Sequence, residues 1–143
     1  MADSLWRRVL FLGRHSQKSD APRVLAVTAL PWDELFYKKL RSTGEWDLIV
    51  ARSVHDALSL LTTQQFPIVL CDRDLPGSDW REVLAKIVES SPKSCFLLAS
   101  RVSDEYLWRE VVAHGGYDVV VKPLEEDAVT QTLHRAWYYW KAG

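Results

Sequence analysis

Short apolar segments alternate with longer amphipathic segments along most of the chain. The apolar runs are continuous and rich in β-branched residues, which is typical of strands that are covered on both faces. In the segments between them, apolar residues recur at helical spacing, and caps or glycines bound several of these segments. The expected strands are 23–28, 47–51, 67–72, 95–99 and 118–121, and the expected helices are 33–43, a helix from Ser53, 80–90, 103–114 and 125–140.

Strands that alternate with helices need right-handed crossover connections, so they form a parallel sheet with helices on both faces. We therefore expect one α/β domain over residues 23–143. Its five-stranded parallel sheet should be doubly wound and should form the middle layer of a three-layer α/β/α sandwich. No internal repeat or low-complexity segment interrupts the pattern.

Residues 1–22 differ from the rest and are expected to form a basic and apolar N-terminal extension. Residues 1–23 carry five basic and two acidic groups. Leu5, Val9 and Leu12 would share one face of a short amphipathic helix. The apolar run is too short for a signal peptide and is followed by no small-residue cleavage site. Two interpretations stay open: the segment docks on the domain or on a partner, or it is a frayed tail or linker.

The overall composition fits one globular domain and excludes several classes of protein. The 143 residues are 48% hydrophobic and 26% charged, with a net charge of −1. No run of about 18 apolar residues could span a membrane. Neither a long basic stripe nor a global positive charge indicates a nucleic-acid partner. Cys71 and Cys95 lie in apolar runs, so we expect buried, reduced thiols in a cytoplasmic protein.

Two charged side chains stand at the ends of expected strands. Asp72 ends the third strand, and Lys122 directly follows the fifth. In doubly wound sheets the ligand crevice lies beyond the carboxyl ends of the strands, which share one edge. We therefore expect Asp72 and Lys122 to converge, either as a structural ion pair or as a site that handles an anion.

Three stretches of the chain resemble the receiver domains of two-component response regulators. The stretch Asp72–Asp79, with its Leu-Pro-Gly turn after an aspartate, resembles the family's phosphoacceptor loop. The stretch His114–Pro123 is similar to the fifth-strand signature that ends in Lys-Pro, and residues 43–53 are similar to the second strand and the following helix entry. The resemblance extends over about residues 23–140 and implies the flavodoxin-like form of the doubly wound fold.

The resemblance implies a role for each matching position. The family's aspartate that corresponds to Asp72 accepts a phosphoryl group from a histidine kinase. The lysine that corresponds to Lys122 contacts the phosphoryl oxygens, and the backbone carbonyl that corresponds to that of Asp74 helps to bind Mg²⁺. All three positions hold suitable residues in this chain.

The expected metal site departs from the family pattern. Phosphorylated receivers have an acidic pair or triplet after the first strand, whereas this chain has Thr28, Ala29 and Leu30 in that place. Mg²⁺ prefers several hard oxygen ligands, usually carboxylates, so Asp72 with carbonyl groups and water should hold it weakly. The metal also neutralises charge when an anionic nucleophile meets a phosphoryl donor. We therefore expect no metal or other cofactor, and Asp72 should be a poor phosphoacceptor.

Two positions that the family uses for switching depart as well. The hydroxyl residue that ends the fourth strand corresponds to Ala99, and the adjacent Ser100 should point the other way. The aromatic switch position of the fifth strand holds Val119. Asp79 is expected to cap a helix from Trp80. The indole of Trp80 should partly cover the rim that the carboxyl ends of the strands form. Together the departures predict an atypical receiver, or pseudo-receiver, that works without phosphorylation.

The last expected helix carries many aromatic residues. Tyr138 and Tyr139 should point away from the sheet, beside basic residues, and exposed aromatics with basic neighbours are typical of a protein interface. In the alternative, the last turn folds its aromatics onto the domain. The residues expected to face the sheet are Val129, Leu133, Ala136, Trp137 and Trp140.

We therefore expect a stand-alone, receiver-like signalling module that is not an enzyme and acts through protein–protein contact. Its partner would be a signalling protein such as a histidine kinase or a regulator, or a second copy in a homodimer. The alternative is a single-domain response regulator of a phosphorelay, phosphorylated on Asp72 with Mg²⁺ bound. A third hypothesis is a small enzyme or nucleotide-binding protein that uses the same crevice. The sequence contains no Cys/His metal cluster and no recognisable catalytic constellation.

Overall fold

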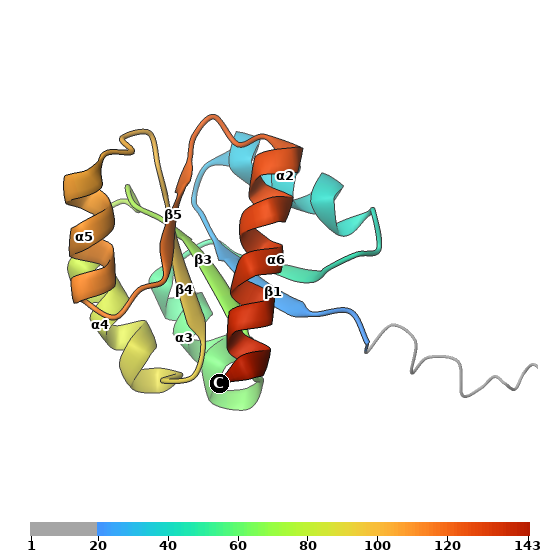
Figure 1. Ribbon diagram of the computed structural model, residues 1–143, viewed down its shortest axis with the longest axis horizontal. Coiled ribbons are helices and arrows are strands. Elements are labelled where there is room, and N and C mark those ends of the chain that lie inside the picture. The colour runs from blue at the N-terminus through green and yellow to red at the C-terminus, as the bar shows by residue number, and fades with distance from the viewer. Residues whose placement is uncertain (1–19) are drawn as a thin grey trace, which may run out of the picture.

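The computed structural model describes residues 20–143 and contains a five-stranded parallel sheet between two layers of helices (Figure 1). The strand order is β2-β1-β3-β4-β5, so β2 and β5 form the edges. This confirms the fold expected from the sequence, although most of the predicted extension lies outside the described residues. The elements are β1 (Arg23–Val27), α2 (Pro31–Arg41), β2 (Asp47–Ala51), α3 (Val54–Thr63), β3 (Ile68–Asp72), α4 (Trp80–Ser90), β4 (Cys95–Ser100), α5 (Glu105–Ala113), β5 (Asp118–Val121) and α6 (Glu126–Ala142).

Each face of the sheet is covered by its own apolar cluster, because neighbouring strand residues point to opposite faces. In β1, Leu25 and Val27 pack with residues of α3, α4 and α5. Val24 and Ala26 pack with residues of α2 and α6 on the other face. All residues of the central strands β3 and β4 are buried. Burial on both faces explains why these strands are apolar without alternation.

Side-chain caps begin three of the helices, as the sequence predicts. The Ser53 hydroxyl accepts a hydrogen bond from the Asp56 backbone amide at 3.1 Å before α3. Asp79 and Asp104 accept backbone hydrogen bonds in the first turns of α4 and α5, at 3.0 and 2.8 Å. Each cap satisfies an amide that has no partner within its helix.

Several predicted boundaries differ from the structure by one or two residues, and three local predictions that concern the site are wrong. Helix α2 begins at Pro31, two residues earlier than predicted, because a proline is well suited to the first helical position. Strand β4 extends to Ser100, one residue later than predicted. Trp80 does not cover the rim: it is buried in the cluster beneath α4, and its ring packs edge-on against His114, at 5.9 Å between centroids. Burial of a large indole in the core outweighs its exposure at a rim.

Two further expectations concern the cysteines and membrane insertion. Cys71 and Cys95 are buried and unpaired, as predicted. Among residues 20–143, no helix combines the length and the apolar character that crossing a membrane requires.

Ion pairs fasten the first turn of α2 to the end of strand β2. The Glu34 carboxylate accepts two hydrogen bonds from the Arg52 guanidinium, at 2.9 and 2.8 Å, and pairs with Lys38 at 3.0 Å. The Arg52 hydrogen bonds, followed by that from Lys38, lower the pKa of Glu34 to about 2. Folding therefore stabilises the ionised carboxylate.

We predict that Glu34 titrates near pH 2 in the folded protein and that Arg52→Gln raises its pKa toward 4.5. Because the folded-state pKa is depressed, the contribution of Glu34 to stability is complete above about pH 4.5 and is lost as the pH falls toward 2. Carboxyl-detected NMR titration measures the shift directly. Lys38→Gln is the control, since it should raise the pKa less than Arg52→Gln; the reverse order would contradict the assignment.

Candidate functional site

Four buried polar residues mark the carboxyl end of the sheet. Thr28, Asp72 and Lys122 follow or end the strands β1, β3 and β5, and Ser100 ends β4. All are at most 9% exposed. Parallel strands bring their carboxyl ends to one rim, which explains why these separated residues meet.

Lys122 is the centre of this rim. Its ammonium lies 2.8 Å from Oδ1 of Asp72 and 2.7 Å from Oδ2 of Asp33. The predicted convergence of Asp72 and Lys122 is therefore confirmed, and the pair takes the form of an ion pair. The peptide bond from Lys122 to Pro123 is cis.

Asp33 is the site residue that the sequence reasoning missed. The family pattern places its acidic residues directly after β1, and in this chain that place holds no carboxylate. Instead, Asp33 is the third residue of α2, whose side chains tilt toward the helix N-terminus and therefore toward the rim. The signal was Pro31, which places the helix start two residues before Asp33.

Asp72 makes further contacts within its own chain. Oδ1 also accepts a hydrogen bond from the Asp74 backbone amide at 3.3 Å. Oδ2 accepts a long hydrogen bond from the Thr28 hydroxyl at 3.5 Å, and Thr28 in turn accepts from the Leu30 amide at 3.1 Å. Both carboxylate oxygens therefore have partners, and the side chain is 2% exposed.

The rim contains two carboxylates and one ammonium. The negative charges of the carboxylates raise the pKa values of ionisable groups nearby. Burial lowers the pKa of Lys122, but the hydrogen bonds with Asp33 and Asp72 and the negative charges of these two groups together raise it above its ordinary value. Burial, followed by the charges of Asp33 and Asp72, raises the pKa of Tyr37. Burial and then Asp72 raise the pKa of Cys71 to about 12. These groups therefore stay in their protonated forms near neutral pH.

Lys122 lies between the two carboxylates that a divalent metal ion at the rim would use. Mg²⁺ takes about six oxygen ligands in octahedral geometry, of which one or two are usually protein carboxylates and several are waters. Within residues 20–143 no group of three or more His, Cys, Asp or Glu side chains could hold a metal ion. The two carboxylates that do converge, those of Asp33 and Asp72, share the Lys122 ammonium.

The positions that depart from the receiver pattern lie in different environments. Thr28 is buried at the rim, whereas Ala29 and Leu30 are exposed. Ala99 is buried in the apolar cluster beneath α2 and α6. Val119 is partly buried against the cluster on the opposite face.

Ser100 ends β4, because this strand extends one residue further than predicted. Ser100 is 1% exposed. Its hydroxyl accepts a hydrogen bond from the Val102 amide at 3.0 Å and lies 3.5 Å from a guanidinium nitrogen of Arg73. The hydrogen bonds found among the described residues do not connect it with Asp72.

The aromatic residues of α6 divide between core and surface. Val129, Leu133 and Ala136 are fully buried against the sheet, with Trp137 and Trp140 packed beside them. Tyr138 and Tyr139 are 64% and 63% exposed. We call these two residues the tyrosine surface. Tyr139 also packs on Tyr117, at 4.9 Å between ring centroids.

Comparisons with known sequences agree with this geometry. The pattern of the response regulator receiver domain matches residues 33–134. The transcriptional regulatory protein ZraR of Salmonella typhimurium is 31% identical over 97 residues, which are 68% of this chain and 22% of ZraR. The chemotaxis protein CheY of Listeria monocytogenes is 29% identical over 69 residues, 48% of this chain and 58% of CheY. The chain therefore spans less than two thirds of each relative's length.

Solved structures show the same fold. The chemotaxis protein CheY4 of Vibrio cholerae has a TM-score of 0.75 at 18% identity, over 81% of this chain and 98% of CheY4. The signal receiver domain of an HD domain-containing protein from Pseudomonas fluorescens has a TM-score of 0.76 at 24% identity, over 85% and 90% of the two chains. With the matched sequence pattern, which covers most of the chain, these findings establish that the chain belongs to the family of response regulator receiver domains.

Proposed function

We propose that this receiver domain signals by protein–protein contact without phosphorylation of Asp72. The observation that supports the proposal best is the state of the Asp72 carboxylate. It is buried, and its two oxygens are bonded to Lys122, to Thr28 and to a backbone amide. A nucleophile must expose an oxygen to the reacting phosphorus, so these contacts would have to be broken before transfer.

The charge balance at the rim supports the same proposal. Phosphoryl transfer to a carboxylate brings two anions together and relies on a cation to neutralise them. Here the Lys122 ammonium already bridges Asp72 and Asp33, so it is the cation that the two carboxylates share. A metal ion would have to compete with a covalently attached cation for both carboxylates.

The alternative function is that of a single-domain response regulator phosphorylated on Asp72 in a phosphorelay. One observation favours this alternative. Asp33 provides a second carboxylate at the rim. In that case Mg²⁺ would have to displace Lys122 from at least one carboxylate, and the protein would require this ion for its response.

The proposed contact with a partner uses the tyrosine surface. Tyr138 and Tyr139 are exposed near the end of α6, where Lys141 lies 5.5 Å above the Tyr138 ring. Tyrosines beside a basic group contribute large contact area and hydrogen bonding at protein interfaces. The chemistry fits a signalling protein, such as a histidine kinase or a regulator, or a second copy of the chain.

We predict that Lys122→Met lowers the free energy of unfolding by about 3–5 kcal/mol, because it leaves the carboxylates of a buried ion pair without their counter-charge. Urea denaturation measures the loss. The control is Lys38→Met, which removes a lysine that is half exposed and pairs with Glu34 within one helix turn. This control should change stability little, so equal losses in the two variants would contradict a structural role for Lys122.

We predict that Mg²⁺ followed by beryllofluoride causes no saturable change in tryptophan fluorescence. Trp32, which is 82% exposed and precedes Asp33, provides a signal beside the rim. The matched variant carries Thr28→Asp and Ala29→Asp, which place an acidic pair after β1. This variant should gain a saturable response to Mg²⁺ if missing carboxylates are the cause. A saturable response of the unmodified protein that disappears in Asp72→Asn would instead establish the phosphorylated alternative.

We predict that a photo-crosslinking amino acid at position 138 captures a partner in cells that produce the protein, whereas one at position 131 does not. Tyr138 belongs to the tyrosine surface, and Gln131 is an exposed residue of the same helix outside it. Mass spectrometry of the crosslinked species compares the two positions. Equal capture at both positions, or capture at neither, would argue against the tyrosine surface as the site of contact.

A further inference from the structure

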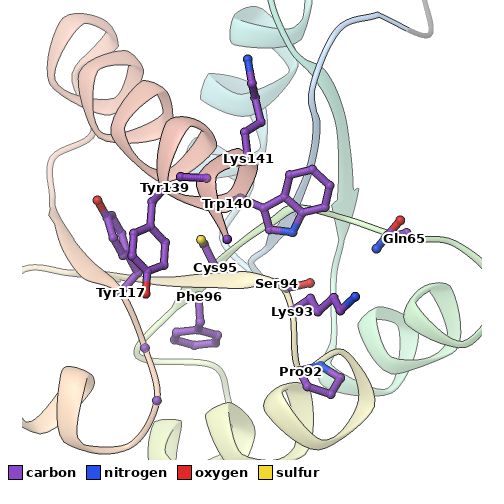
Figure 2. Close-up of a pocket in the computed structure, with 14 residues that line it drawn as sticks. Gln65, Pro92, Lys93, Ser94, Cys95, Phe96, Tyr117, Tyr139, Trp140 and Lys141 are labelled. Carbon is purple, nitrogen blue, oxygen red and sulfur yellow. The ribbon is translucent and has the colours of Figure 1, made fainter.

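A groove opens at the end of the sheet where the strands begin, opposite the rim. It has a volume of about 820 Å³ and lies between the start of β4, the start of β5 and the last turn of α6. Figure 2 shows Tyr117 and Tyr139 side by side at one end, Trp140 toward the other end, and the Cys95 thiol between them. Lys93 lies at the side of Trp140. Aromatic side chains therefore form part of the walls, together with a cysteine and small residues, and two lysines also line the groove.

The chain contains an apolar segment that joins the domain at this end of the sheet. Residues 1–19 lie outside the described structure and join β1 through residues 20–22. Within them, the stretch 4–12 is apolar and basic, and Leu5, Val9 and Leu12 recur at the spacing of one helical face. Such a face is complementary to an aromatic groove.

The connection is long enough for the segment to reach the groove. All strands are parallel, so β1 and β4 begin at the same end of the sheet, with only β3 between them. Two strand spacings amount to about 10 Å. Ten residues separate Leu12 from Arg23, and they can span up to about 33 Å. The reach therefore exceeds the lateral distance between the two strands about threefold.

We propose that the segment 4–12 docks its apolar face in this groove of its own chain. Leu5, Val9 and Leu12 then contact the aromatic walls, and the charged groups of the segment remain in solvent. An unlinked peptide would pay the full entropy of association, whereas the covalent connection gives the segment a high effective concentration at the groove. Docking is independent of the state of Asp72.

The docked segment would also shield one wall that belongs to the tyrosine surface. Tyr139 lines the groove and is 63% exposed in the absence of a cover. A partner that needs Tyr139 would therefore compete with the segment. This consequence rests on the proposed function, but the docking itself does not.

Paramagnetic relaxation enhancement in the full chain tests the docking. A nitroxide is attached to Ser4→Cys; burial holds the pKa of Cys71 at about 12 and that of Cys95 at about 11, so both native thiols should resist labelling. We expect a selective loss of the amide signals of Gly116 and Lys141, which line the groove. Amide signals at the opposite rim, such as that of Asp74, should keep their intensity.

The matched control adds Leu5→Asp and Val9→Asp to the labelled protein, which removes the apolar face but keeps the label and the tether. The loss of groove signals should then disappear. Retention of groove signals in the labelled parent would overturn the proposal. A second sample mixes isotope-labelled chains that carry no nitroxide with nitroxide-labelled chains that carry no isotope. Loss of the groove signals in this mixture would identify a second copy as the occupant and would overturn docking within one chain.

Discussion

The parallel direction of all five strands is the constraint on which both ends of this molecule depend. Parallel strands place all their carboxyl ends at one end of the sheet and all their amino ends at the other end. One end therefore gathers the polar residues that end or follow strands, among them Asp72 and Lys122. The other gathers the strand starts and the last turn of α6, where the aromatic groove lies. Two surfaces of opposite character thus arise from one topology, at opposite ends of the sheet.

The polar rim is held together by charge. A buried carboxylate is costly unless an opposite charge and hydrogen bonds replace its water. Lys122 provides that charge to two carboxylates at once, and Thr28 and the Asp74 amide provide the remaining hydrogen bonds to Asp72. The arrangement is self-contained, because each charged partner belongs to the chain. It differs in this respect from a site that depends on a dissolved metal ion for its balance.

The fold and most of the rim could be predicted from the sequence. Continuous apolar runs and helical spacing are local signals, and strand-end positions located Asp72 and Lys122 without any knowledge of side-chain contacts. Asp33 was missed because its place at the rim depends on where α2 begins, and helix boundaries follow from tertiary packing as well as local preference. The same uncertainty in boundaries placed the end of β4 one residue too early. Trp80 was misplaced because its burial depends on how α4 packs against α5, which no local pattern specifies.

The first turn of α2 joins the two outer margins of the sheet. Asp33 is paired with Lys122, which follows the edge strand β5, and Glu34 is paired with Arg52, which follows the opposite edge strand β2. The side chains of two consecutive residues thus connect the two sides of the sheet at the carboxyl ends of the strands. A rotation of this turn could not loosen one margin without straining the other. The ammonium of Lys122 is therefore linked, through two adjacent side chains, to the residue that follows the opposite edge strand.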